Sequence, residues 1–218
     1  MDDPLIQLEG VEFSYGPARP VLSGCDFRLE AGQRLALLGG NGSGKTTLLH
    51  LIVGLLRPAG GRIRAFGRLR SGESDFHEVR RRAGLLFQDT DDQLFCPTVA
   101  EDVAFGPLNL GKPRAEVRRI VAETLQSLGL DDYEHRITYH LSGGEKRLVA
   151  LATVLAMQPD VLLLDEPTSE LDEQATERLI EVLGGLPQAM IVVSHNRPFW
   201  QRVAAAAVQL RQGRIEAC

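Results

Sequence analysis

The segment GGNGSGKT at residues 39–46 constrains this chain more than any other part of its sequence. It follows the continuous apolar run RLALL at 34–38 and precedes a stretch at 45–56 that we expect to be helical and to end before Pro58. The segment fits the pattern Gly-x-x-x-x-Gly-Lys-Ser/Thr, which requires a buried strand before it and a helix after it. The sequence therefore predicts a strand, a phosphate-binding loop and a helix in this order.

Each residue type in the phosphate loop (residues 39–46) has a chemical reason. Glycines let the backbone wrap closely around phosphate oxygens, and successive amides at a helix N-terminus then face the anion. Lys45 is expected to reach the terminal phosphates of a nucleotide, and the hydroxyl of Thr46 to bind Mg²⁺. A flexible glycine turn before a helix is the alternative. One of only three lysines in the chain stands at the required position, which favours phosphate binding.

A pair of carboxylates follows a second apolar run. VLLLDEP at 161–167 places Asp165 and Glu166 at the carboxyl end of a strand, where open α/β sheets bind their ligands. Asp165 is expected to orient Mg²⁺, directly or through water, and Glu166 to act as general base or polarising group for an attacking water. Taken alone, the pair would fit a capping role at a strand end equally well. The phosphate loop earlier in the chain favours the catalytic role.

Apolar runs and helical patterns alternate along the chain. The runs at 34–38, 161–164 and 189–193 are continuous, as in central parallel strands, whereas 5–13 and 21–29 alternate, as in antiparallel strands with one wet face. The predicted fold class is α/β, a single domain of residues 1–218 in which a helical subdomain of about 90–157 is inserted. Helices are expected at 45–56, 99–109, 113–129, 142–157 and 173–183, and a hairpin at 206–210 and 214–217.

The bulk composition excludes several classes. Hydrophobic residues make up 44% and charged residues 24%, as in ordinary globular domains. The net charge of -5 and the pI of about 5.6 argue against nucleic acid as the main partner. The start lacks a signal pattern, and no apolar run approaches the roughly 20 residues that span a bilayer. Three cysteines without metal spacing fit a reducing compartment, so we expect a cytoplasmic protein that meets a membrane only through a partner.

A second capping pattern, Leu141-Ser-Gly-Gly-Glu145, opens the helix predicted at 142–157. Two glycines at the start of a helix are destabilising unless another group must approach the backbone closely. A plain helix cap is one explanation. The other is a second helix N-terminus that faces phosphate. Because the phosphate loop already supplies one, the second would serve a neighbouring subunit.

Taken together, these motifs resemble those of the ATP-binding cassette (ABC) ATPases. In chain order they are GGNGSGKTT, Gln88, LSGGEKRLVALA, VLLLDEP, SELD at 169–172 and His195, and the similarity spans essentially the whole chain. The resemblance implies a P-loop NTPase fold with a parallel-sheet core, an N-terminal antiparallel β subdomain and a helical signature subdomain. It also implies a sandwich dimer with ATP and Mg²⁺, in which each ATP lies between the phosphate loop of one subunit and the signature segment (residues 141–145) of the other.

The resemblance assigns roles to individual residues. Tyr15 would stack on adenine, with strand packing as the alternative, and His195 would contact the γ-phosphate. Gln88 would reach Mg²⁺ and the attacking water, and Asp172 would lie at the dimer interface. The implied ATP-binding residues are Tyr15, Gly39, Asn41, Gly42, Ser43, Gly44, Lys45, Thr46 and Thr47. Those facing the partner's ATP are Ser142, Gly143, Gly144 and Glu145, and those near Mg²⁺ are Thr46, Gln88 and Asp165.

Three positions depart from the family pattern. Gly40 stands where proline is frequent, Glu170 where small residues are frequent, and Asn196 where aspartate is common. None of these changes removes a catalytic group, so we expect activity to be retained.

The stretch FQDTDDQLFCPTVAEDVAFGPLNLG at 87–111 resembles more narrowly the energy-coupling-factor importers of cobalt, nickel and vitamins. In that group the DDQLF segment forms a short helix beside the groove that receives the coupling helices of a membrane subunit. The resemblance implies an integral membrane scaffold and a separate substrate-binding membrane subunit as partners. It makes Gln93, Leu94 and Phe95 candidate docking residues, although Leu94 and Phe95 would alternatively tuck into the helical subdomain.

The predicted function is ATP hydrolysis by a subunit of a membrane importer, with closure of the ATPase dimer moving a membrane partner. An ATPase of another transporter type and a soluble cassette of DNA repair or translation are alternatives. The soluble cassettes need a long coiled-coil insertion or two fused cassettes, and neither fits in 218 residues. A non-hydrolysing subunit is disfavoured by Lys45, Asp165, Glu166 and His195. The sequence leaves open the cargo and the choice between a homodimer and a heterodimer.

Overall fold

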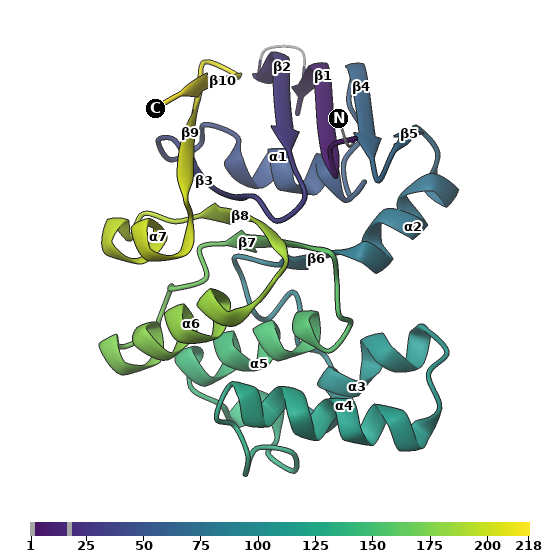
Figure 1. The fold of residues 1–218 in the computed structure, drawn as a ribbon, viewed down its shortest axis with the longest axis vertical. Helices are drawn as coiled ribbons and strands as arrows, with labels where there is room; N and C mark the ends of the chain where they lie inside the picture. The colour runs from purple at the N-terminus through teal and green to yellow at the C-terminus, as the bar shows by residue number, and fades with distance from the viewer. Residues whose placement is uncertain (1–2, 17–18) are drawn as a thin grey trace. The chain divides into compact units, whose positions relative to one another are not determined.

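The computed structural model describes residues 3–16 and 19–218. These residues form two compact units, each built from separate stretches of the chain. The first unit takes in the chain up to Leu85, then Asp160–Asp165 and Pro187–Cys218. The second consists of Leu86–Pro159 and Glu166–Leu186. Figure 1 traces the chain from purple at the N-terminus to yellow at the C-terminus.

The first unit contains a four-stranded antiparallel sheet with the order β2-β1-β4-β5. Along β1 (Ile6–Ser14) and β2 (Pro20–Leu29), buried apolar residues alternate with more exposed ones, which confirms the predicted antiparallel strands. The sequence patterns do not predict β4 (Gly60–Ala65) and β5 (Arg68–Arg70). Glycine and arginine interrupt the apolar alternation there, so the strand signal is weak.

A six-stranded sheet has the order β10-β9-β3-β8-β7-β6. Its strands are β3 (Arg34–Leu38), β6 (Ala83–Leu86), β7 (Val161–Asp165), β8 (Ala189–Val193), β9 (Ala206–Arg211) and β10 (Arg214–Ala217). Strands β9, β3, β8 and β7 run parallel, and every residue of β7 and β8 is buried, as predicted for central strands. The predicted hairpin of β9 and β10 turns at Gln212 and Gly213, whose φ angles of 50° and 76° suit a two-residue hairpin turn.

Three helices belong to the first unit: α1 (Lys45–Ile52), α2 (Glu73–Arg82) and α7 (Arg197–Val203). Helix α1 ends at Ile52 and not at the predicted residue 56, because Gly54 adopts a left-handed φ of 73°. The sequence patterns predict neither α2 nor α7. Helix α2 buries only two of its ten residues and α7 has seven residues, so neither carries a strong periodic signal.

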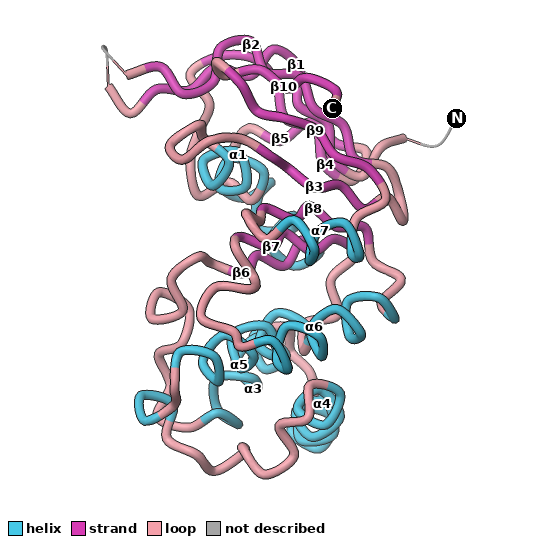
Figure 2. The backbone as a smooth tube through the Cα atoms, turned by 90° about the vertical axis from the view of Figure 1, so that its left-hand side faces the viewer, coloured by secondary structure: helices cyan, strands magenta, loops and turns pink. Residues whose placement is uncertain are grey.

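The second unit is helical. Its helices are α3 (Val99–Asn109), α4 (Arg114–Ser127), α5 (Gly143–Leu155) and α6 (Glu173–Gly185). Helix α5 packs against α3 and α4 (Figures 1 and 2). Both predicted capping boxes are present, because the side chains of Thr98 and Ser142 accept from the backbone N–H groups of Glu101 and Glu145. Within the described residues, no helix has the length and apolar character that crossing a membrane requires.

Candidate nucleotide-binding and hydrolysis site

The phosphate loop joins β3 to α1 in the first unit, and its geometry requires glycine. Gly44 is the N-cap of α1 with a φ of 103°, and a Cβ there would lie 2.6 Å from Cγ1 of Val21. Gly39 has a φ of 152°, and a Cβ there would lie 2.6 Å from Oγ of Ser43 and 2.8 Å from the carbonyl oxygen of Leu210. Backbone conformation and close neighbours therefore both exclude a side chain at these two positions.

Lys45 is the first residue of α1 and is largely buried, with 9% of its surface exposed. Its Nζ donates hydrogen bonds to the carbonyl oxygens of Gly39 at 2.8 Å and Gly40 at 3.1 Å. These bonds hold the ammonium group against the loop backbone. A phosphate oxygen is a stronger, charged acceptor than a carbonyl, so a nucleotide entering the loop would attract this ammonium.

The loop also holds a donor that fits an anion. Among the described residues, the buried Oγ of Ser43 has no hydrogen-bond partner. A buried hydroxyl without a partner is destabilising, and a phosphate oxygen would satisfy it. Asn41 and Gly42 lie exposed in the same loop. The N-terminus of α1, the Lys45 ammonium and the Ser43 hydroxyl together fit a polyphosphate.

Tyr15 lies just beyond β1, and its side chain has two contacts within the first unit. Its ring is 58% exposed and packs edge-on against Phe13, with ring centroids 4.9 Å apart. Its hydroxyl lies 3.1 Å from Oγ1 of Thr47 on α1. An exposed aromatic ring beside the phosphate-binding helix suits adenine stacking, whereas the Phe13 contact suits strand packing, so both readings of Tyr15 have structural support. Sequence reasoning does not find the hydroxyl contact, which joins residues far apart in the chain.

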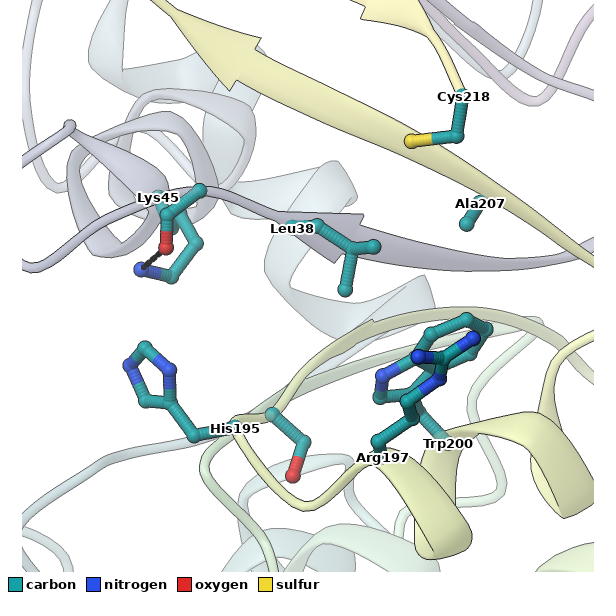
Figure 3. Close-up of a pocket in the computed structure, with 9 residues that line it drawn as sticks. Leu38, Lys45, His195, Arg197, Trp200, Ala207 and Cys218 are labelled. Atoms are coloured by element: carbon teal, nitrogen blue, oxygen red, sulfur yellow. Dashed lines mark hydrogen bonds between the residues drawn. The ribbon is translucent and has the colours of Figure 1, made fainter.

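A cavity of about 400 Å³ opens beside Lys45, and Figure 3 shows the side chains that line it. The lining includes His195, which follows β8, and Arg197 at the start of α7. His195 is exposed, and its ring faces the side of the cavity on which Lys45 lies (Figure 3). This placement suits a contact with the terminal phosphate. Asn196 caps α7 by accepting from the N–H of Phe199 at 3.1 Å, so this departure from aspartate keeps a helix cap.

Asp165 and Thr46 offer the oxygen ligands that Mg²⁺ prefers. Asp165 is the last residue of β7 and is 2% exposed. Burial lowers the pKa of His50, and the negative charge of Asp165 opposes that shift. Within the described residues no cluster of three or more His, Cys, Asp or Glu side chains could hold a metal ion. The Asp165 carboxylate and the Thr46 hydroxyl are of the oxygen type that binds Mg²⁺ together with substrate phosphates and water.

Glu166 follows Asp165 and opens the second stretch of the second unit. Its φ is 48°, a left-handed conformation that is uncommon outside glycine. Such a backbone costs on the order of 1–3 kcal/mol and concentrates at functional sites. The strained conformation therefore supports a functional role for Glu166, which stays a prediction here.

In the second unit, the signature segment opens α5 with its polar groups paired. Ser142 is exposed, and its N–H and Oγ donate to the carboxylate of Glu145, each at 2.8 Å. The hydroxyl of Tyr133 donates to the same carboxylate at 2.6 Å, and this bond holds the pKa of Glu145 below its usual range. Glu145 thus stabilises the start of α5, where Ser142 is exposed and its hydroxyl is paired with Glu145.

Gly143 and Gly144 have a close neighbour inside their own unit. A Cβ at Gly143 would lie 1.8 Å from Oε2 of Glu170, and one at Gly144 would lie 3.1 Å from the carbonyl oxygen of Glu170. Glu170 itself has a φ of 65°. A side chain at 143 would therefore have to displace the flexible carboxyl end of Glu170, so this contact alone does not require glycine there. The side chain of Asp172, predicted at the dimer interface, caps α6 by accepting from the N–H of Ala175 at 2.7 Å.

The segment 87–95 lies in the second unit, with Gln88 exposed. The N–H groups of Gln93 and Leu94 donate to the carbonyl oxygen of Thr90, so the segment forms one turn and not a regular helix. Both ends of the Gln93 amide are bonded within the unit, to Phe87, Ala150 and Thr153. This arrangement favours a structural role for Gln93 over a docking role.

Leu94 and Phe95 differ in exposure. Leu94 is partly buried, whereas Phe95 is 64% exposed and packs edge-on against Phe105, with ring centroids 4.8 Å apart. Phe105 on α3 is itself 46% exposed. The two rings therefore form an aromatic pair on the surface of the second unit, which suits an apolar partner.

Asp102, on α3, fixes the backbone next to Phe95. It is 3% exposed and accepts hydrogen bonds from the N–H groups of Phe95 at 3.1 Å and Cys96 at 2.9 Å. Its other carboxylate oxygen accepts from Oγ1 of Thr138 at 3.2 Å. Thr138 lies just before the signature segment, so this buried carboxylate connects two predicted functional segments. Sequence reasoning does not find Asp102.

Comparison with known proteins places these features in a family. A family model described as ABC transporter matches residues 22–169. A putative ABC transporter ATP-binding protein of Brucella suis biovar 1 is 55% identical over 97% of this chain and 88% of its own length. The energy-coupling factor transporter ATP-binding protein EcfA of Methanothermobacter thermautotrophicus is 42% identical over 97% of this chain and 69% of its own length.

Two further similarities agree with these. The nickel import ATP-binding protein NikO of Rhodobacter capsulatus is 44% identical over 98% of this chain and 88% of its own length. The solved structure of CbiO1 from Clostridium perfringens, part of the ABC transporter complex CbiONQ, has a TM-score of 0.87. It is 32% identical, and the match covers 99% of this chain and 88% of that one.

The parallel sheet, the phosphate loop and Lys45 define a P-loop nucleoside triphosphatase. Together with the family match and the relatives above, they show that the chain belongs to the ABC transporter family, as an ATP-binding and ATP-hydrolysing member. The predicted family, fold class and ATPase activity are thereby confirmed.

Proposed function

We propose that this chain is the ATP-hydrolysing subunit of an energy-coupling-factor-type importer, which carries a metal ion such as cobalt or nickel, or a vitamin. The similarity to the EcfA and NikO proteins over nearly the whole chain carries this proposal. The resemblance of segment 87–111 to the same group supports it independently of the shared ATPase motifs.

Hydrolysis is assigned to residues at the carboxyl ends of the parallel strands. The phosphate loop (residues 39–46), followed by Thr47, binds the phosphates through its amides, the Ser43 hydroxyl and the Lys45 ammonium. Thr46, Asp165 and Gln88 are the residues that would hold Mg²⁺, which when bound would neutralise phosphate charge. Glu166 accepts a proton from the attacking water or polarises it, and His195 donates to the γ-phosphate from the cavity that it shares with Lys45.

A complete site requires two ATPase subunits. We assign the signature residues Ser142, Gly143, Gly144 and Glu145 to the ATP of the partner subunit and Asp172 to the interface. The exposed Ser142 hydroxyl and the N-terminus of α5, a helix of thirteen residues, support this assignment, since both favour an anion. Tyr15 stacks on adenine from its exposed position.

The second unit is the proposed contact with the membrane partners. Its helices α3 to α5 correspond to the predicted helical subdomain of about 90–157, inserted into the ATPase core. Leu94 and Phe95, with Phe105, form the apolar docking surface for an integral membrane scaffold subunit, which in turn binds a substrate-binding subunit. The chain then works at the cytoplasmic face of the membrane, held there by its partners.

One variant tests the hydrolytic assignment. Glu166→Gln keeps the shape of the side chain and the bound ATP, but should lower turnover by about 10²–10³-fold because the carboxylate is lost. The measurements are nucleotide binding and steady-state ATPase activity of the purified chain, with Glu181→Gln on the exposed face of α6 as a matched control. Undiminished turnover in Glu166→Gln would refute the role of Glu166.

Copurification tests the transport assignment. The tagged wild-type chain, extracted from membranes of its own cell in mild detergent, should bring with it integral membrane proteins, identified by mass spectrometry. Recovery of ribosomes or nucleic acid in their place would overturn the importer and favour a soluble cassette.

A further inference from the structure

The backbone around Gln88 is held by α5, the helix that the signature segment opens. Arg147, on α5, is 4% exposed, and its guanidinium reaches segment 87–95. Nη1 donates to the carbonyl oxygen of Phe87 at 2.7 Å, and Nη2 donates to the carbonyl oxygen of Gln88 at 2.5 Å. Two nitrogens of one planar guanidinium thus bind two consecutive carbonyls, as the rigid fork of arginine allows.

A second side chain holds the same backbone from the other direction. Oε1 of Gln93 accepts from the N–H of Phe87 at 3.1 Å. Its Nε2 donates to the carbonyl oxygen of Ala150 and to Oγ1 of Thr153, both at 2.8 Å, and both acceptors lie on α5. Helix α5 therefore bonds the carbonyl groups of Phe87 and Gln88 directly through Arg147. It bonds the N–H of Phe87 through the side-chain amide of Gln93.

We propose that Arg147 is a positioning residue for Gln88, and that through it the orientation of the signature helix sets the reach of the Gln88 side chain. This proposal rests on the role of Gln88 in the proposed function. The Gln88 side chain is exposed, and the Cα of Gln88 lies between the two carbonyls that Arg147 binds. The direction in which the Gln88 side chain projects therefore depends on these two hydrogen bonds.

A structural role for Arg147 is the competing explanation, because a buried arginine with backbone partners stabilises any helical unit. The two roles predict different kinetics. If Arg147 acts through Gln88, its loss changes nothing once the Gln88 amide is gone. If it only stabilises the unit, the effects of the two substitutions multiply, or the substitution of Arg147 leaves turnover unchanged.

The experiment measures kcat, KM for ATP and thermal midpoint for the purified full chain with four substitutions. These are Gln88→Ala, Arg147→Lys, the double variant and Lys146→Met. Arg147→Lys keeps the charge but replaces the planar two-nitrogen fork by a single nitrogen on a shorter side chain, so the fixed geometry of the two bonds is lost. Lys146 is the matched control, because it lies next to Arg147 on α5 and bonds the same segment only through the side chain of Asp91, at 2.6 Å.

We expect Arg147→Lys to lower kcat by about 10–100-fold with KM for ATP changed less than about threefold, as displacement of a group near the chemistry does. The double variant should be no slower than Gln88→Ala by more than about threefold. Lys146→Met should retain kcat within about twofold.

The outcomes separate the two proposals. A reduced kcat in Gln88→Ala with an unchanged kcat in Arg147→Lys, or effects that multiply in the double variant, would overturn the positioning role and leave the proposed function standing. An unchanged kcat in Gln88→Ala would overturn the role of Gln88 in the proposed function, and the positioning role with it. If Arg147→Lys does not fold, Arg147→Gln, whose amide still donates to one carbonyl, decides by the same comparison.

Discussion

Replacing Asp102 with alanine should destabilise the second unit more than any other single polar substitution described above. The change removes one acceptor for the N–H groups of Phe95 and Cys96 and for the hydroxyl of Thr138. Water can reach the two part-buried N–H groups, so each loss costs about 1 kcal/mol, whereas the Thr138 hydroxyl is buried and its loss costs about 1–3 kcal/mol. The expected loss in free energy of unfolding is therefore about 3–5 kcal/mol.

The assay is urea-induced unfolding followed by circular dichroism at the helical band, since the second unit is helical. The matched variant is Asp102→Asn, whose carbonyl oxygen still accepts from both N–H groups while its amide donates to the hydroxyl of Thr138. It should cost less than about 1.5 kcal/mol. For a chain of this size the alanine variant should lower the thermal midpoint by about 6–20 °C. A cost for Asp102→Ala within about 1 kcal/mol of that for Asp102→Asn would refute the reasoning, because the three hydrogen bonds would then contribute little.

Three further predictions concern side chains of differing exposure. Tyr15→Ala should weaken nucleotide binding more than it slows saturated turnover, and Tyr15→Phe should stay close to wild type. Titration with a fluorescent nucleotide measures the affinity. The reverse pattern would show that the Tyr15 ring packs against the strand and does not stack on adenine. Replacing both Leu94 and Phe95 with serine should weaken the recovery of membrane partners by pull-down, while basal ATPase activity is spared. If the partners are still recovered but the thermal midpoint of the chain falls, these two residues are structural. The exposed thiol of Cys218 should react with Ellman's reagent at pH 8 in the native chain. Burial raises the pKa of Cys25 to about 11, so the thiol of Cys25 should react only after the chain is unfolded. Equal reaction rates for both thiols would contradict the burial of Cys25.

The parts of the fold that could be predicted carry their signal within a few residues. The phosphate loop is one continuous motif, and β7 and β8 are continuous apolar runs. Thr98 and Ser142 are the N-cap residues of their helices, and each is followed three residues later by the glutamate that completes its capping box. Helix α2 is missed because its exposed face is nearly all charged and its length gives few turns over which periodicity can be seen.

The contacts that organise the candidate site could not be predicted in the same way. Arg147 and Phe87 are 60 residues apart, and no local pattern states that they meet. One signal was present: Arg147 stands in helical phase with the buried residues Ala150, Leu151 and Val154, so an arginine occupies the apolar face of α5. A charged residue at such a position requires a partner, although the sequence does not identify it. Gln93 shows the opposite case, since a resemblance suggested a docking role where the hydrogen bonds favour a structural one.

If Glu166 has its proposed role in hydrolysis, its left-handed backbone makes thermal stability and turnover conflict at a single position. Glycine adopts a φ of 48° without strain, so its introduction there should relieve about 1–3 kcal/mol of strain. About 0.4–1 kcal/mol of this gain is offset by the greater freedom of glycine in the unfolded chain, and the carboxylate is lost. Laboratory evolution of this chain toward heat resistance alone would then favour glycine at position 166, and the proposed role of Glu166 predicts that the selected protein is stable and inactive. A screen for such variants should score ATP turnover in every round, because folding yield and melting temperature would report the loss as an improvement.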